Sequence, residues 1–232
     1  MHRALLSHVR RATLVALALL PAALPAQIFK VGRRSEEPLL WASLSAGLFQ
    51  SQSVIDGSTD SEWALNDALQ WRGSLEYSLR GGSALGVVAT HARVPFHYRG
   101  PGCTLGGDVA VPCSLDANMT VQSVWGTFHG GDGVGFHGVF EGGLGYTWYR
   151  SFESEDDQDP FADMNADRDF SFVLGTGFGY APSRRLSFNV VRDWAWVRHQ
   201  GEGLTNDDRT TTQQYTTRLG VRYGFGNRRA GL

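Results

Sequence analysis

Residues 215–225 read YTTRLGVRYGF, and their character alternates from one residue to the next. One set is apolar, aromatic or Thr and includes Tyr215, Leu219 and Phe225, whereas the other set carries Arg218 and Arg222. Because successive side chains of a β-strand point to opposite faces, the segment predicts a strand with an apolar face and a basic face. In a soluble protein the apolar face would pack on a second sheet. In a membrane barrel it would face lipid, and the arginines would line a polar lumen.

The composition favours a protein built from strands. The chain has 232 residues, 29 of them Gly, and 12% are aromatic. Its mean hydropathy is −0.23, and after the first residues no window is apolar over the ~20 residues that a membrane helix needs. Glycine for tight turns, together with aromatic residues, is typical of β architectures.

The first residues have the layout of a secretory signal peptide. Arg3, Arg10 and Arg11 precede an apolar run at 12–20, and LPAQ predicts cleavage after Ala26. The alternative is a membrane anchor, but the run is too short to span ~30 Å as a helix. Loss of the three arginines takes the formal net charge from −2 to about −5, which excludes a nucleic-acid-binding protein.

Cys103 and Cys113 are the two cysteines of the chain. Export to an oxidising compartment predicts that they form a disulfide across a short loop rich in Gly and Pro. Two free thiols are the alternative.

Alternating segments recur along the chain, and the connections between them have two lengths. The connections after the second, fourth and sixth segments are short, and the others are long and polar. A soluble sandwich gives no reason for this order, whereas an eight-stranded antiparallel up-and-down transmembrane β-barrel has short periplasmic turns and long extracellular loops. The eight segments are 39–50, 67–80, 83–98, 117–129, 134–150, 169–180, 185–199 and 215–225.

The signal peptide, the alternating connections and a last strand with outward aromatics together resemble the small eight-stranded outer-membrane β-barrels, the OmpA-like, OmpX-like and OmpW-like group. Many members end in Phe, whereas Phe225 is followed here by seven residues. The resemblance implies a cell outer-membrane location, contact with outer-membrane lipid and lipopolysaccharide, and insertion by the barrel assembly machinery. The expected layout is a signal peptide at 1–26, a periplasmic lead-in at 27–38, the barrel at 39–226 and a tail at 227–232.

The polar faces predict a charged lumen. An eight-stranded barrel is wide enough only for side chains to fill it, so we expect a plug of paired charges. A narrow polar channel for small or amphipathic solutes is the alternative. The predicted lumen charges are Arg72, Glu76, Arg93, Glu141, Asp193, Arg218 and Arg222, with His91 and His137 beside them.

Two further groups of residues point to ligands. Arg192 has outward parity, and we expect it to reach lipopolysaccharide phosphates with Arg150 and Arg198; a β-bulge or a protomer contact that hides it is the alternative. Asp163, Asn165 and Asp167 have the oxygen spacing of a calcium loop, but Arg168 stands where such loops have Gly. A solvated acidic loop is the alternative there, and no cofactor is expected.

The histidines argue against catalysis. We expect His91, His97, His137 and His199 to point inward, so that no outward His lies beside a Ser at the outer rim. The sequence therefore predicts a non-enzymatic barrel that contributes to envelope integrity or to surface contacts with an unknown extracellular ligand. A narrow pore is the second hypothesis, and a lipid A-modifying enzyme is the third.

Overall fold

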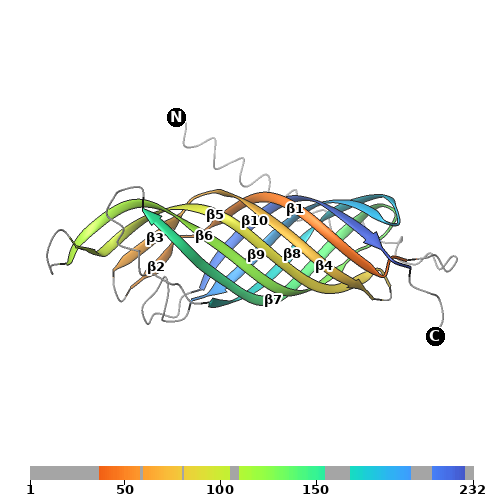
Figure 1. Cartoon of the computed structure of the whole chain (residues 1–232), viewed down its shortest axis with the longest axis horizontal. Helices are drawn as coiled ribbons and strands as arrows, with labels where there is room; N and C mark the ends of the chain where they lie inside the picture. Colours follow the sequence, from red (N-terminus) through yellow and green to blue (C-terminus); the bar gives the residue numbers. More distant parts are fainter. Residues whose placement is uncertain are drawn as a thin grey trace, which may run out of the picture. The chain divides into compact units, whose positions relative to one another are not determined.

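The computed structural model describes residues 37–57, 60–79, 81–104, 110–154, 168–199 and 211–227, which form an all-β fold. Eight strands form a closed antiparallel barrel, because β5 pairs with β4 on one side and β6 on the other (Figure 1). No helix in these residues is long and apolar enough to cross a membrane. The strands are β1 (Leu40–Ser51), β2 (Val54–Asp56), β3 (Ser61–Leu65), β4 (Ala68–Ser78), β5 (Ser83–Thr104), β6 (Ala110–Gly130), β7 (Gly135–Ser154), β8 (Arg168–Ser183), β9 (Leu186–Arg198) and β10 (Thr211–Phe225).

The strand register determines the geometry of the barrel. Paired residues followed once around the wall from Leu40 return to β1 at Gln50, ten residues further along. A shift of this size over eight strands corresponds to a strand tilt of ~40°. The expected pairing of the last strand with the first is present, with Leu40 opposite Phe225.

The predicted fold class is confirmed, and the strands differ from the prediction mainly at one end. We call the end with the connections at 79–82, 131–134 and 184–185 the turn end, and the opposite end the loop end. The predicted long connection after β1 contains the hairpin β2–β3, which the sequence analysis missed, and β3 continues along β5 beyond β4. β5, β6 and β7 have 22, 21 and 20 residues, and β5 and β6 extend furthest at the loop end (Figure 1).

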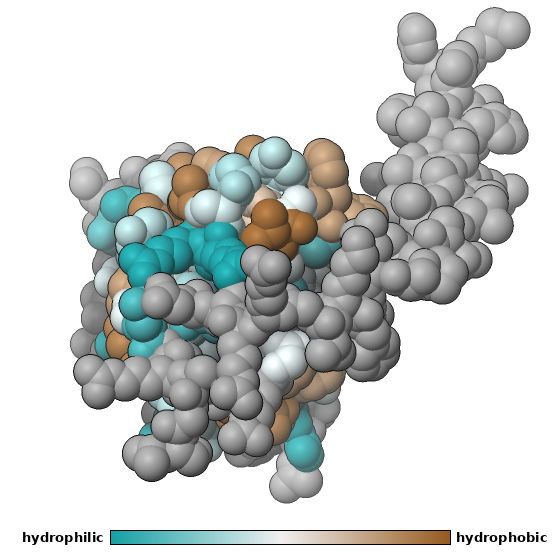
Figure 2. Space-filling model, turned by 90° about the vertical axis from the view of Figure 1, so that its right-hand side faces the viewer, coloured by the Kyte–Doolittle hydropathy of each residue, from teal (hydrophilic) through white to brown (hydrophobic). Residues whose placement is uncertain are grey.

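Glycines make the tight connections of the turn end. Gly81 and Gly82 have φ of 81° and 74°, values that L side chains rarely adopt. The amide of Asp132 donates to the carbonyl of Gly82 at 3.1 Å, which ties two neighbouring turns together. In a view of this end, hydrophilic side chains face the viewer and hydrophobic ones gather along the margin (Figure 2).

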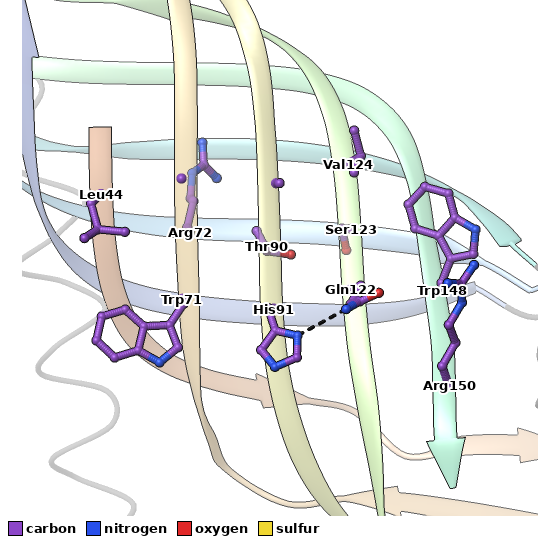
Figure 3. Close-up of a pocket in the computed structure, with 12 residues that line it drawn as sticks. Leu44, Trp71, Arg72, Thr90, His91, Gln122, Ser123, Val124, Trp148 and Arg150 are labelled. Atoms are coloured by element: carbon purple, nitrogen blue, oxygen red, sulfur yellow. Dashed lines mark hydrogen bonds between the residues drawn. The ribbon is translucent and has the colours of Figure 1, made fainter. Parts of the chain in front are cut away.

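The outer surface of the barrel carries a broad apolar band. Leu44, Leu75 and Leu219 are each more than 60% exposed, and about twenty other large hydrophobic residues also lie on the surface. A groove of about 500 Å³ crosses this surface from β1 to β7 (Figure 3). Such a band would be costly in water, but it is the expected surface of a barrel in lipid.

The interior has two zones of opposite character. Toward the turn end it is filled by ion pairs. Toward the loop end it is an apolar cluster that contains Phe49, Phe96 and Met119, each at most 1% exposed. The hairpin β2–β3 adds Val54 and Trp63 to this cluster.

The predicted orientation of β5 and β6 is wrong. Val94 and Met119 point inward, whereas His91 and Arg93 point outward. The apolar face was assigned to lipid, but in the part of these strands near the loop end it is the face that forms the interior cluster. Trp125 of β6 likewise lies inside the barrel and is 4% exposed.

The predicted signal peptide and most of the lead-in fall within residues 1–36, outside the described part of the chain. Both remain predictions.

Candidate functional site in the lumen

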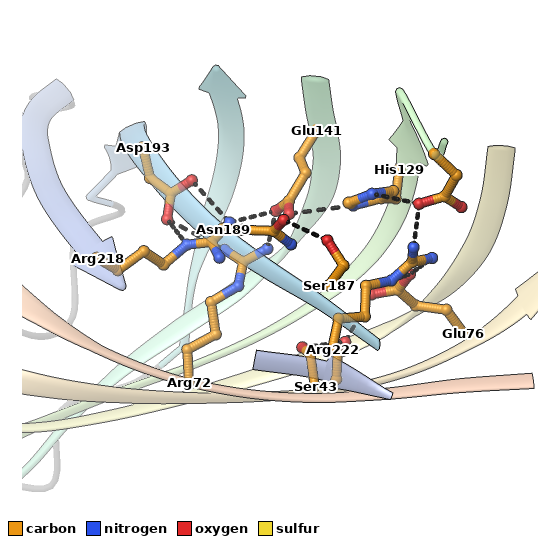
Figure 4. Close-up of polar contacts among 12 residues, drawn as sticks. Ser43, Arg72, Glu76, His129, Glu141, Ser187, Asn189, Asp193, Arg218 and Arg222 are labelled. Atoms are coloured by element: carbon orange, nitrogen blue, oxygen red, sulfur yellow. Dashed lines mark hydrogen bonds and ion pairs between the residues drawn. The ribbon is translucent and has the colours of Figure 1, made fainter. Parts of the chain in front are cut away.

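Four charged side chains from four strands meet in the lumen (Figure 4). Arg218 of β10 donates through Nε to Asp193 of β9 at 2.7 Å and through Nη2 to Glu141 of β7 at 2.6 Å. Arg72 of β4 pairs with Glu141 and, at 3.3 Å, with Asp193. Each arginine therefore contacts both carboxylates, and β4 is joined across the lumen to β7 and β9.

A second group continues this network toward the turn end. Arg222 pairs with Glu76 at 2.6 Å and with Asp132 of the connection after β6. Its guanidinium lies over the ring of Trp41, 4.1 Å from the centroid, which is a cation–π contact. Arg222 is 1% exposed and heads the largest fully buried side chains of the described residues.

His129 joins the two groups. Its Nδ1 lies 3.2 Å from Glu141 and its Nε2 lies 3.4 Å from Asp132. Because a carboxylate can only accept, both ring nitrogens are positioned to donate, as in an imidazolium. Four cations (Arg72, Arg218, Arg222 and His129) then face four anions (Glu76, Asp132, Glu141 and Asp193).

Charge balance is what makes this burial tolerable. A buried charge without a partner lowers the stability of a protein by roughly several kcal/mol. Pairing and hydrogen bonding between buried charges offset much of that cost. Around Asp132, burial raises the pKa of the carboxyl, but the hydrogen bond from His129 and the charge of Arg222 outweigh it. The pKa of Asp132 is therefore lowered from its usual value of 3.8.

Glycines on β8 leave room for this network. A Cβ on Gly175 would collide with Asp193 Oδ1, and one on Gly179 would lie 2.6 Å from Asn189 Oδ1. The inner face of β8 is thus kept bare where polar side chains of β9 project.

The structure brings six of the seven predicted lumen charges together. The seventh, Arg93, was wrongly placed: its side chain is 62% exposed and pairs with Glu153 on the outer surface. His129, Asp132 and Trp41 belong to the site and were missed. The inward parity of Trp41 beside Leu40 on β1 could have revealed one of them, but His129 was hidden by the reversed orientation of β6.

The loop end holds another buried polar chain. His199 is 1% exposed; its Nδ1 lies 2.7 Å from Asp169 Oδ2 and its Nε2 lies 2.8 Å from Thr212 Oγ1. It joins β8, the end of β9 and β10 at the positions where the long connections begin and end.

A similar chain lies on the outer surface. Ser114 Oγ is 2.9 Å from Nε2 of His97, and Nδ1 of His97 is 2.8 Å from Asp116. The His97 side chain is 37% exposed. The expectation that His97 points inward is therefore wrong, and an outward His does lie beside a Ser.

Three of the outward arginines lie against aromatic rings. Arg192 donates to Thr217 Oγ1 at 2.5 Å and to Gln50 Oε1 at 3.4 Å, and lies 5.2 Å from the Tyr215 ring centroid. Arg150 lies over Trp148 at 6.0 Å, and Arg198 is exposed. Arg168, which was not predicted to belong to this group, lies over the ring of Tyr146, 5.3 Å from its centroid.

Two predicted sites fall outside what the structure describes. Asp163, Asn165 and Asp167 lie in the undescribed segment 155–167. The backbone of Cys103 on β5 is opposite Val111, and that of Cys113 on β6 is opposite Gly100, but their side chains are not described. The calcium site and the disulfide remain predictions.

No protein-family model and no curated protein matches this sequence. Solved structures share its fold. Neisserial surface protein A matches with a TM-score of 0.54 at 10% identity, over 82% of this chain and 100% of that chain. The outer membrane protein OprG from Pseudomonas aeruginosa matches with a TM-score of 0.50 at 11% identity, over 84% of this chain and 99% of that chain. The predicted resemblance to small eight-stranded outer-membrane β-barrels is confirmed for the fold.

Proposed function

We propose that the protein is an outer-membrane β-barrel with a side-chain plug, which contributes to envelope integrity or to surface interaction through its extracellular loops. The ion pairs of Arg72 and Arg218 with Glu141 and Asp193 carry this proposal. All four residues are at most 7% exposed and they cross-link opposite walls of the lumen. A permeant solute would have to break this network, so the proposal assigns no transport and no reaction to the lumen.

Conductance of the refolded protein in planar bilayers tests the plug. The wild type should show no stable ion current. Combining Arg72→Ser, Glu141→Ser, Asp193→Ser and Arg218→Ser, which together leave the net charge unchanged, with Phe96→Ser and Met119→Ser, which open the apolar cluster at the loop end, should give a conducting barrel. The double variant Arg93→Ser, Glu153→Ser, which removes an ion pair from the outer surface, is the matched control and should stay closed. A stable wild-type current would refute the plug and favour the narrow pore.

The apolar band and the shared fold support an outer-membrane location, with the loop end outside and the turn end in the periplasm. The proposed partners are outer-membrane lipid, lipopolysaccharide phosphates at Arg150, Arg192 and Arg198, and the barrel assembly machinery. Membrane fractionation, together with a gel mobility that changes on heating, tests the location. Recovery in the soluble fraction would contradict it.

A second candidate function rests on Ser114, His97 and Asp116. A nucleophile, a base and an orienting carboxylate at these distances are the arrangement used in ester hydrolysis. His97 lies four residues beyond the exposed Arg93 toward the loop end, where the outer surface carries charges, so a substrate would be an ester outside the bilayer. A fluorophosphonate probe that labels the wild type but not Ser114→Ala or His97→Ala would support this candidate. Absence of wild-type labelling would exclude it.

A further inference from the structure

The groove on the outer surface is the feature with the clearest unassigned chemistry (Figure 3). Its volume of about 500 Å³ is that of many small-molecule sites. The groove exists because two small residues, Gly73 on β4 and Ala89 on β5, face each other in register between larger neighbours. Leu44 and Trp71 flank them on one side, and Val124 does so on the other.

The loop-end side of the groove is polar. His91 and Gln122 are opposite each other on β5 and β6, and Gln122 Nε2 lies 3.3 Å from His91 Nδ1. Trp148 and Arg150 on β7 complete that side. Arg150 lies over the Trp148 ring, and no carboxylate of the described residues lies within ion-pair distance of it.

This arrangement is unusual for a surface that faces lipid. Polar side chains in an apolar environment are costly unless they find a partner. The hydrogen bond between His91 and Gln122 uses one ring nitrogen and one amide hydrogen, and leaves further donors and acceptors directed at the groove. The groove therefore offers an apolar floor, then hydrogen-bonding groups, and then a guanidinium, in that order toward the loop end.

We propose that this groove binds one lipid A molecule of the outer leaflet. An acyl chain lies over Gly73 and Ala89, His91 and Gln122 bind the carbonyl or hydroxyl groups near the head of that chain, and Arg150 binds a phosphate. A phosphorylated lipid matches the charge of Arg150, and the outer leaflet matches the position of the polar side at the loop end. The inference rests on the proposed outer-membrane location and adds a defined site and occupant to it.

Native mass spectrometry of the refolded barrel, mixed with lipid A, phosphatidylglycerol or phosphatidylcholine, tests the site. The wild type should retain one lipid A through detergent removal. Gly73→Leu should reduce this retention at least tenfold by filling the floor; a Cβ there comes no closer than 3.8 Å to Ser43 O, so the barrel accommodates it. Arg150→Gln should weaken retention of lipid A as well.

Two matched controls make the result specific. Gly138→Leu places the same side chain on the outer surface of β7, outside the groove, where a Cβ would have no heavy atom within 4 Å. Arg184→Gln removes a charge at the turn end. Both should retain lipid A as the wild type does.

Three outcomes would overturn the proposal. They are equal retention of lipid A by Gly73→Leu and Gly138→Leu, equal retention of phosphatidylcholine by the wild type, and preferential retention of phosphatidylglycerol. Each variant is first shown to be folded by its gel mobility before and after heating. Failure of the lipid site then leaves the bilayer conductance test of the plug unaffected, and the two proposals fail separately.

Discussion

The two halves of the barrel interior solve the same packing problem with opposite chemistry. Toward the turn end, eight charged side chains pair across the lumen, and toward the loop end an apolar cluster around Phe96 and Met119 fills the space. Both halves are closed to solvent. On the outer surface the pattern is reversed, because the wall around the apolar cluster carries exposed charges such as Arg93 and Glu153. This contrast fits the proposed location, in which the loop end would project from the bilayer and the turn-end half would lie in lipid.

The largest expected effect is at the centre of the charged half. Arg218→Met leaves Asp193 and Glu141 buried with fewer partners, and we expect a loss of about 3–5 kcal/mol in the free energy of unfolding. Urea unfolding in lipid vesicles, followed by tryptophan fluorescence, measures this. A loss below ~1 kcal/mol would show that the ion pairs contribute little to stability.

The apolar half should respond to a change of volume rather than of charge. Met119→Ala leaves a cavity among fully buried neighbours, and we expect a loss of about 3 kcal/mol. The same vesicle assay measures it. Because the ion pairs remain intact, the bilayer conductance should stay as low as that of the wild type, and a conducting Met119→Ala variant would show that the apolar half is the real barrier.

Acid should separate the two halves. The pKa of Asp132 is lowered in the folded state, so its contribution is present above its unfolded pKa near 3.8 and is lost as the pH falls below that value toward the folded pKa. Asp132→Asn should cost about 1–2 kcal/mol at pH 7. The difference from the wild type should shrink steadily below about pH 4. A difference independent of pH would mean that the carboxylate charge is not what stabilises this end.

The smallest effect should come from the arginine on the outer surface. Arg93→Met removes an ion pair that water screens, so we expect a change below ~1 kcal/mol. It is the natural control for Arg218→Met, because both replace an arginine that pairs with Glu by the same residue. Equal losses in the two variants would contradict the contrast between buried and exposed pairs.

Much of the fold was predictable because most strands have one apolar and one polar face along their whole length. On six of the eight barrel strands, the apolar set faces outward as predicted, and the segment at 215–225 is the central part of β10. The alternation of short and long connections gave the topology. The alternation of polar and apolar side chains along each strand placed six charged residues on inner faces: Arg72, Glu76, Glu141, Asp193, Arg218 and Arg222.

The errors in the predicted direction of side chains have one physical cause. Alternation on β5 and β6 shows which face is apolar, but not whether that face meets lipid or a packed interior. Near the loop end the interior is apolar and the outer surface carries charges. An apolar strand face there points inward, although the same face was predicted to point outward. Arg93, His91 and His97 were all misplaced for this reason, and His129 was missed with them.

The sequence by itself determined the closed eight-stranded barrel and the inward direction of six lumen charges, because the period of a strand and the length of a turn are local properties. Only the tertiary structure decided which charges pair, that Asp132 and His129 join them, and that Gly73 and Ala89 open a groove on the wall. These depend on the ten-residue shift around the barrel, which brings side chains from distant strands to the same height. No local pattern specifies that shift, because it arises only when the sheet closes.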